Sequence, residues 1–361
     1  MKRAFPTLIL LLLLTGACSP LYVLRAGWEE AKILARREPI PEVIADPRTP
    51  EDWRAKLALV LRARDFAADS LGLDAGESYT TFSELDSDTL ALVVSAAYRD
   101  RFEAYTWWFP IVGRVPYKGF FSERAAFEAA ADLQQEGFDT YIRPTSAFST
   151  LGWFSDPLVS SLMRYDSVQL ANTVAHELFH NTFFAAGQVQ FNESAASFVG
   201  SRAAIDFFCR RAPGSSACAE ARSAWADDLL FSDFLDGLVA ELEALYARAD
   251  LTSEQKIALR EQVFDRARAR FAEEVQPRMR TGGFAGFAGA PLNNAILLAR
   301  RLYYHRLEVF ERVFRRYGED LPRTIAAIVR AAEGAEGAEG AEGAEDAYAA
   351  VDSLVASRDT G

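Results

Sequence analysis

The segment His176-Glu177-Leu178-Phe179-His180 is the feature that most constrains what this chain can fold into. Two histidines four residues apart lie on one face of a helix, about 6 Å from each other, so both imidazoles can bind one zinc ion. Glu177 then lies beside the ion, where a general base can take a proton from a water molecule that the metal activates. The other interpretation is a core helix with two hydrogen-bonded histidines. However, two of the three histidines in the chain fall in this pattern.

A second segment, Asn192-Glu193, supplies the remaining ligand. Hydrolytic zinc sites combine two histidines with one carboxylate and leave a fourth position open, so the predicted zinc ligands are His176, His180 and Glu193. Asn192 is a favourable helix N-cap, and we expect a second helix to start at Glu193. Small residues near Glu193 on this helix would allow close packing on the first one: Ala196, Ser197 and Gly200. Because Ser197 is not an acid, no carboxylate is predicted there to orient a histidine ligand.

The N-terminus resembles a bacterial lipoprotein signal. Lys2 and Arg3 precede an apolar run at residues 8–14, which is too short to span a membrane but has the length of a signal-peptide core. Small residues then lead to Cys18, so residues 1–17 are the expected signal peptide and Cys18 the expected lipidation site. A secretory signal cleaved nearby is the alternative. Either signal exports the chain, and we expect a membrane-anchored protein on the periplasmic side of the cell envelope.

The other two cysteines, Cys209 and Cys218, agree with export. They close a short loop that contains Pro213 and Gly214, and in an oxidising compartment such a pair is expected to form a disulfide. Zinc binding by this pair is the alternative, but no further cysteine or histidine stands near them in the sequence.

The apolar pattern predicts a mainly helical α+β fold with a small mixed or antiparallel sheet before the zinc helix. Helices are expected at residues 22–34, 53–71 and 122–135, and a proline-rich extended connector at residues 39–50. Strands are expected where β-branched and aromatic residues cluster, around residues 93–102, 107–115 and 140–142. The expected organisation is a signal at residues 1–17, an anchor and linker at 18–50, a peptidase domain at 51–330 and an acidic tail at 331–361.

The second half is predicted to be mostly helical, with runs at residues 219–249, 253–276 and 292–317. A capping box from Thr252 to Gln255 opens the middle run. The glycine-rich segment 281–290 carries two phenylalanines and is either a lid over a cleft or a flexible connection. A three-residue repeat at 332–345 lacks large apolar side chains, so we expect a solvated spacer there and a short helix at 347–356.

Residues 146–157 precede the zinc helix and supply candidate substrate-binding residues. An exposed strand edge near a metal can pair with an extended peptide, and the candidates in this segment are Gly152, Trp153 and Asp156. The alternative is an ordinary loop that packs Trp153 and Phe154 into the core.

Amide hydrolysis also needs a hydrogen-bond donor for the oxyanion. A tyrosine phenol, with a pKa of about 10, stays protonated for this purpose. Tyr303 is the first candidate, followed by Tyr304 and His305. Adjacent positions on a helix point about 100° apart, so only one or two of them can face the site.

Beyond the zinc motif, four segments form a distinctive set: Trp108-Phe-Pro-Ile-Val-Gly-Arg-Val-Pro-Tyr-Lys-Gly-Phe120, Ser149-Thr-Leu-Gly-Trp-Phe-Ser-Asp-Pro157, Phe191-Asn-Glu-Ser194, and Leu292-Asn-Asn-Ala295 followed by Tyr303. Together they resemble the bacterial Putative aminopeptidase family, which are predicted zinc peptidases of the gluzincin type. The resemblance implies a zincin-like metallopeptidase with His176, His180 and Glu193 as ligands and Glu177 as base. An aminopeptidase also needs an anionic group for the substrate's α-amine, and the candidates are Asp156 and Glu123.

The function expected from the sequence is therefore a zinc-dependent aminopeptidase that acts on peptides. One alternative is a zinc endopeptidase of envelope proteins, which would tolerate blocked amino termini. Another is a non-catalytic lipoprotein that binds zinc or a partner. Glu177 argues against the latter, because a structural zinc site needs no base and usually has four protein ligands. The net charge of −12, with no basic run, argues against nucleic acid as a partner.

Overall fold

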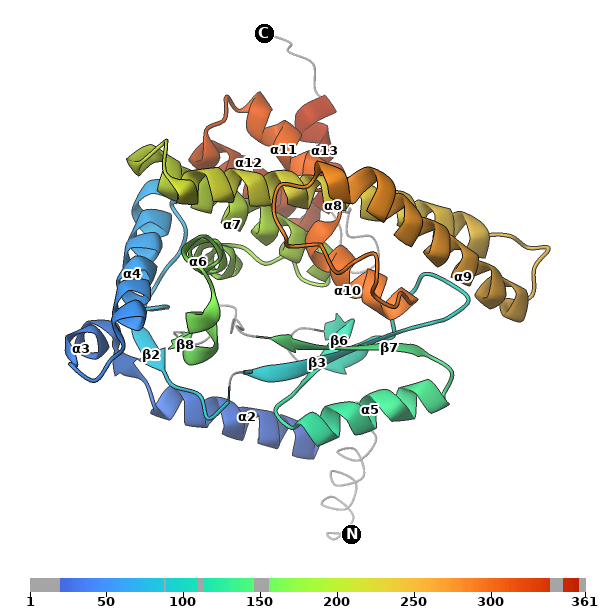
Figure 1. Cartoon of the computed structure of the whole chain (residues 1–361), viewed down its shortest axis with the longest axis horizontal. Helices are drawn as coiled ribbons and strands as arrows, with labels where there is room; N and C mark the ends of the chain where they lie inside the picture. Colours follow the sequence, from blue (N-terminus) through green and yellow to red (C-terminus); the bar gives the residue numbers. More distant parts are fainter. Residues whose placement is uncertain (1–19, 88, 110–112, 146–155, 338–346, 357–361) are drawn as a thin grey trace, which may run out of the picture.

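The computed structural model describes residues 20–87, 89–109, 113–145, 156–337 and 347–356, with helices on both sides of a small sheet (Figure 1). Two helices run along the bottom of this view, α2 (Pro20–Ala35) and α5 (Glu123–Gln135), and most of the others lie above the sheet. The predicted mainly helical α+β fold is confirmed. Over the described ranges, no helix combines the length and the apolar character that crossing a membrane requires.

The main sheet has three strands in the order β6 (Tyr117–Phe120), β3 (Ala91–Ala97) and β7 (Asp139–Thr145). β3 is antiparallel to both neighbours, and Val94 lies opposite Lys118 on one side and Ile142 on the other. The remaining strands form two small sheets: β1 (Glu38–Pro39), β2 (Thr81–Ser83) and β8 (Leu158–Val159), and the pair β4 (Trp107–Phe109) and β5 (Gly113–Val115).

Helix α5 covers one face of the main sheet with the apolar side that its periodicity creates. Ala126 and Ala130 of α5 pack against Val94 of β3 in a small core. The helix begins after Ser122, whose hydroxyl accepts a hydrogen bond from the amide of Ala125. The helix predicted at residues 122–135 is thereby confirmed.

The helices above the sheet build two larger cores. The first contains α4 (Glu51–Leu71), α6 (Ser167–Thr182) and α7 (Val189–Arg211). The second is rich in phenylalanine and contains α8 (Ser216–Tyr246), α9 (Ser253–Arg270) and α10 (Asn294–Tyr304). Three short helical turns flank these helices: η1 (Ser160–Arg164) precedes α6, and η2 (Phe271–Val275) and η3 (Gln276–Arg278) follow α9. The predicted capping box is confirmed, because Thr252 and Gln255 cap the start of α9 reciprocally.

The glycine-rich segment 281–290 is a fixed part of the second core. Phe284 and Phe287 are both buried. The ring of Phe284 stacks on Phe231 of α8 with centroids 4.2 Å apart. The segment is therefore neither the lid nor the flexible connection that its glycines suggested.

The single helix predicted at residues 292–317 is divided into α10 and α11 (Leu307–Arg316). Arg306 interrupts it with a left-handed backbone, at a φ of 51°. Asp236 of α8 stabilises the break, because its carboxylate accepts a hydrogen bond from the amide of Arg306 and contacts Nδ1 of His305 at 2.7 Å. The prediction was wrong because a contact from a distant helix determines this conformation.

Two further segments are more helical than predicted. Helix α3 (Ile40–Ala45) lies inside the stretch expected to be an extended connector. Helix α12 (Leu321–Gly337) continues into the repeat and buries Ala332 and Ala335, so this part of the repeat is not a solvated spacer. The last predicted helix is confirmed as α13 (Ala347–Ala356), which packs on α11 and α12. Residues 338–346 lie outside the described chain.

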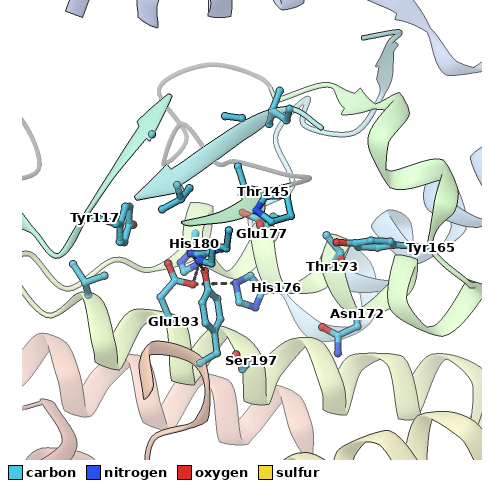
Figure 2. A pocket seen from close by; sticks show the side chains of 18 of the residues that line it. Tyr117, Thr145, Tyr165, Asn172, Thr173, His176, Glu177, His180, Glu193 and Ser197 are labelled. Atoms are coloured by element: carbon cyan, nitrogen blue, oxygen red, sulfur yellow. Dashed lines mark hydrogen bonds and ion pairs between the residues drawn. The ribbon is translucent and has the colours of Figure 1, made fainter. Parts of the chain in front are cut away.

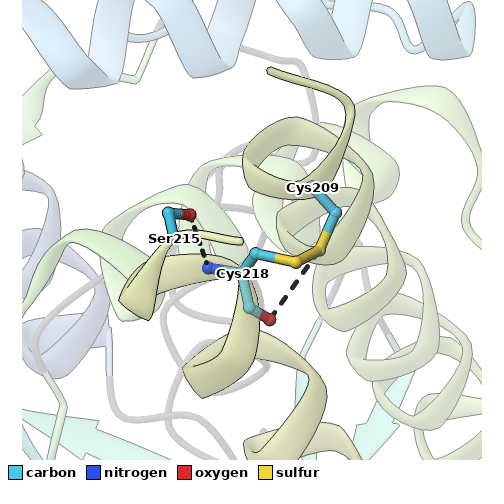
Figure 3. Close-up of a disulfide and its surroundings, with 3 residues drawn as sticks. All are labelled: Cys209, Ser215 and Cys218. Atoms are coloured by element: carbon cyan, nitrogen blue, oxygen red, sulfur yellow. Dashed lines mark hydrogen bonds between the residues drawn. A yellow bond between two sulfur atoms is a disulfide. The ribbon is translucent and has the colours of Figure 1, made fainter. Parts of the chain in front are cut away.

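Cys209 near the end of α7 and Cys218 at the start of α8 form a disulfide bond (Figure 3). The hydroxyl of Ser215 caps α8 by accepting a hydrogen bond from the amide of Cys218. The bond closes the turn between two helices that pack on each other. It excludes the alternative in which these cysteines bind zinc.

A buried ion pair connects α9 to the sheet and to α10. The guanidinium of Arg260 donates hydrogen bonds of 2.7 and 3.0 Å to the carboxylate of Asp139 at the start of β7, and both residues are buried. Asp139 also accepts a hydrogen bond from the amide of Asn294 at the start of α10. These contacts hold β7 against α9 and α10, and α10 completes one side of the cavity described below.

Removal of the buried cation should therefore destabilise the protein. We expect Arg260→Met to lower the free energy of unfolding by about 3 kcal/mol, because the Asp139 carboxylate stays buried without its main partner. Urea unfolding followed by circular dichroism measures this change. As a control, Arg248→Met breaks an exposed pair with Asp250 and should cost less than about 1 kcal/mol. Equal losses in the two variants would contradict the structural role of the buried pair.

Candidate metal centre and active site

Helix α6 presents the first two candidate ligands. Asp166 and Gln169 form a capping box that fixes the start of this helix. His176 and His180 then lie one turn apart, and their ring centroids are 4.9 Å from each other. The helix and the spacing predicted for this motif are both present.

Helix α7 carries Glu193 and crosses α6 at very short range. A Cβ atom added to Gly200 would lie 2.8 Å from the backbone oxygen of Asn172 and 3.1 Å from Cβ of His176. Any larger side chain at this position would push the two helices apart. The expectation of close packing through small residues is met at this glycine.

Asn192 has a different role from the one predicted. Helix α7 starts at Val189, so Asn192 lies within its first turn and the predicted helix start at Glu193 is wrong. The side-chain amide of Asn192 instead accepts a hydrogen bond from the amide of Ala185 and donates one to its carbonyl, both at 2.8 Å. These bonds hold the loop after α6 against α7, directly beside Glu193.

The three predicted ligands meet at one point (Figure 2). Nε2 of His176 lies 3.4 Å from Oε2 of Glu193, and Nε2 of His180 lies 3.6 Å from the same oxygen. The three atoms lie within 4.8 Å of one another, and this is the one such group in the described part of the chain. Two imidazole nitrogens and a carboxylate oxygen are the donor set of hydrolytic zinc sites, so these residues fit a zinc ion.

The electrostatics of the centre favour an ionised Glu193. Burial alone would raise the pKa of Glu193, but hydrogen bonds from His176 and His180 lower it well below its usual value. Burial opposes the charge on His180, and Glu193 overcomes this effect and raises the pKa of His180. Glu193 therefore offers an anionic oxygen to a cation.

Glu177 lines the same cavity without belonging to the ligand group. Burial raises the pKa of its carboxyl, the two imidazoles oppose this rise, and the charges of Glu193 and Asp156 add to it. A carboxylate with a raised pKa is a stronger base, which favours proton transfer at neutral pH. Glu177 therefore lies in the cavity with the raised pKa that a general base needs, and it is not part of the ligand group.

Tyr303 of α10 lies beside the ring of His176. The two ring centroids are 6.2 Å apart and the planes differ by 28°. Arg143 of β7 donates a hydrogen bond of 3.2 Å to the Tyr303 hydroxyl. Burial and the charge of Glu193 raise the pKa of Tyr303, so the hydroxyl keeps its proton. Tyr117 of β6 lines the same cavity, and the same two causes raise its pKa.

The other two candidate donors lie in different surroundings. Tyr304 also lines the cavity, but its ring packs edge-on against Phe231 and Phe284. His305 turns toward Asp236 and is not among the described residues that line the cavity. Of the three candidates, Tyr303 is the one that the structure brings to the ligands.

The cavity has a volume of about 850 Å³ and lies between the main sheet and the α6–α7 pair. The sheet contributes residues of β3, β6 and β7, and one side is completed by α8 and α10. Two acids that the sequence did not suggest also line it, Glu30 of α2 and Asp228 of α8.

The predicted substrate-binding residues have mixed outcomes. Gly152 and Trp153 lie outside the described residues. Asp156 is buried, and its backbone oxygen accepts a hydrogen bond from the amide of Tyr79. Glu123 is exposed at the start of α5. Neither acid is among the described residues that line the cavity, so neither is positioned to bind a substrate amine there.

Arg143 and Tyr117 are site residues that sequence reasoning missed. Tyr117 belongs to the distinctive segment Trp108 to Phe120, and Arg143 directly follows a predicted strand, so weak signals existed for both. Their side-chain chemistry gave no sign of a role, because only the pairing of β6 and β7 with β3 brings them to the cavity.

A family model described as Putative aminopeptidase matches residues 21–340. This range contains α6, α7 and α10, which carry the ligands, Glu177 and Tyr303. No curated protein and no solved structure matches the chain.

The geometry predicts that zinc uptake depends on Glu193. The wild-type protein should bind about one zinc ion per chain after dialysis against zinc, as sites with this donor set do. Glu193→Gln should lose most of this metal, because the anionic ligand is replaced by a neutral amide. Glu220→Gln, an exposed change on α8, is the control and should bind zinc normally. Plasma mass spectrometry measures the content, and equal loading of all three proteins would contradict the assignment.

Proposed function

The chain belongs to the Putative aminopeptidase family, and from this membership we propose that it is a zinc-dependent aminopeptidase of the gluzincin type. The observation that carries the proposal is the convergence of His176, His180 and Glu193 beside Glu177 in one cavity. A structural zinc site would need no adjacent base and would usually have four protein ligands. The group found here has three, which fits a hydrolytic site.

The zinc ion, when bound by these three side chains, would supply a Lewis acid that activates water and polarises the scissile carbonyl. Glu177 takes the proton of the attacking water and passes it to the leaving amine. The protonated hydroxyl of Tyr303 donates a hydrogen bond to the oxygen that becomes negative. Arg143 holds the Tyr303 hydroxyl in place, since the guanidinium donates a hydrogen bond to the hydroxyl oxygen of Tyr303.

The proposed location is the periplasmic side of a bacterial cell envelope, with a lipid on Cys18 as the anchor. The N-terminal pattern of Lys2, Arg3 and the apolar run at residues 8–14 supports this part of the proposal, although residues 1–19 lie outside the described chain. The disulfide between Cys209 and Cys218 supports it independently, because such bonds persist in oxidising compartments.

Replacement of the base should separate catalysis from metal binding. We expect Glu177→Gln to keep its zinc and to lower kcat/KM for peptide hydrolysis by about 10²- to 10⁴-fold, because the amide cannot accept the water proton. Metal analysis and hydrolysis assays on the same preparation test this. The control variant Glu220→Gln should keep full activity. Full activity of Glu177→Gln would eliminate Glu177 as the base.

Peptides with free and blocked amino termini distinguish an aminopeptidase from an endopeptidase. We expect hydrolysis of a free peptide at its first bond and no hydrolysis of the N-acetylated peptide of the same sequence, because an aminopeptidase must recognise the free amine. Liquid chromatography with mass spectrometry identifies the products. Equal cleavage of both peptides, at internal bonds, would favour the endopeptidase, and a chelator should abolish either activity.

A further inference from the structure

Asp228 is a cavity-lining carboxylate that the mechanism above does not use. It lies on α8 and borders the same cavity as the metal ligands. Within the described ranges, no hydrogen bond or ion pair reaches this carboxylate. Its neighbour Asp227 is fully engaged, because it accepts hydrogen bonds from the amides of Arg280 and Thr281 and from the Thr281 hydroxyl. Asp227 therefore holds the start of the glycine-rich segment, while Asp228 faces the cavity.

The surroundings of Asp228 make it a site for a cation. Burial and the charge of Asp227 raise the pKa of Asp228 to about 7. The guanidinium of Arg300, which acts on Tyr304 as Asp228 does, lies over the rings of Phe231 and Phe287. A partly buried carboxylate without a partner is unfavourable, and a cation that enters the cavity would relieve this cost.

Asp228 also belongs to the same space as the metal centre. On α7, Ser197 follows Glu193 by one turn and lines the cavity with a small side chain (Figure 2). On α10, Tyr303 lies at the ligands, and the pKa of the next residue, Tyr304, is raised by burial and by the charge of Asp228. A short substrate can therefore reach both the metal centre and this carboxylate.

We propose that Asp228 binds a primary ammonium group of the substrate. The inference rests on the aminopeptidase function proposed above, and it supplies the anionic group that neither Asp156 nor Glu123 provides in the cavity. An ammonium group has three hydrogen-bond donors and a positive charge, which match the oxygens of a carboxylate. The α-ammonium of the first residue is one source of this group, and a lysine side chain is the other.

Glu30 is the competing acid in the cavity. One of its carboxylate oxygens is buried without a hydrogen-bond partner among the described residues, and burial and the charge of Asp156 raise its pKa. However, the charge of Asp228 acts on Tyr304, the sequence neighbour of Tyr303 at the ligands, whereas the charged neighbour of Glu30 is Asp156, which is not among the described residues that line the cavity. A Glu30→Gln variant therefore belongs in the test.

Peptide binding to a protein that cannot turn over tests the inference directly. In zinc-loaded Glu177→Gln protein, isothermal titration calorimetry would compare trialanine amide, its N-acetylated form and N-acetyl-lysyl-alanine amide. Adding Asp228→Asn should weaken the binding of the peptide whose ammonium group it holds by about 10- to 100-fold, because a charged hydrogen bond is lost. It should leave N-acetyl-trialanine amide unchanged. Asp233→Asn removes an exposed carboxylate of the same helix and should change no affinity.

A loss confined to trialanine amide assigns the α-ammonium group, and a loss confined to the lysyl peptide assigns the side chain. The inference is overturned if Asp228→Asn weakens neither, if Glu30→Gln produces the loss instead, or if the parent protein binds all three peptides equally. Hydrolysis by protein with Glu177 intact is measured separately. Its absence would count against the proposed function, while the binding result would still decide the role of Asp228.

Discussion

Everything at the candidate active site depends on the close crossing of α6 and α7. Gly200 allows this approach, because a side chain there would collide with the backbone of Asn172 and with Cβ of His176. At this distance a glutamate on α7 reaches the two imidazoles on α6. The interaction of Asn192 with the loop after α6 secures the same junction from its other end. A packing constraint between two helices thus becomes a constraint on the geometry of a metal centre.

The charges around this centre are arranged in complementary roles. Glu193 is held ionised, as a metal ligand must be, whereas Glu177 has a raised pKa, as a general base requires. Arg143 brings positive charge to the sheet side of the cavity and supports Tyr303. Asp228 brings negative charge from α8. In the proposed arrangement, Tyr303 would bind the carbonyl oxygen at the bond to be cleaved, and Asp228 would bind an ammonium group close to that bond.

The sequence revealed the parts of this site that depend on local periodicity, and it missed those that depend on long-range packing. Helix geometry alone places the two histidines on one face and the small residues of α7 near Glu193, so His176, His180 and Glu193 could be predicted as one group without coordinates. Arg143 and Asp228 could not, because their positions depend on strand pairing and on how α8 packs against α7. The break at Arg306 has the same origin, since Asp236 of a distant helix stabilises it. The burial of alanines in α12 was missed because small side chains give no amphipathic signal.

Anomalous X-ray scattering at the zinc absorption edge, from crystals of zinc-loaded protein, tests the centre most directly. We predict one strong peak about 2.0–2.2 Å from Nε2 of His176, from Nε2 of His180 and from a carboxylate oxygen of Glu193. Glu177 should lie outside this first set of ligands. A peak bound by other residues, or no peak in protein saturated with zinc, would contradict the assignment of these three side chains as the catalytic metal site.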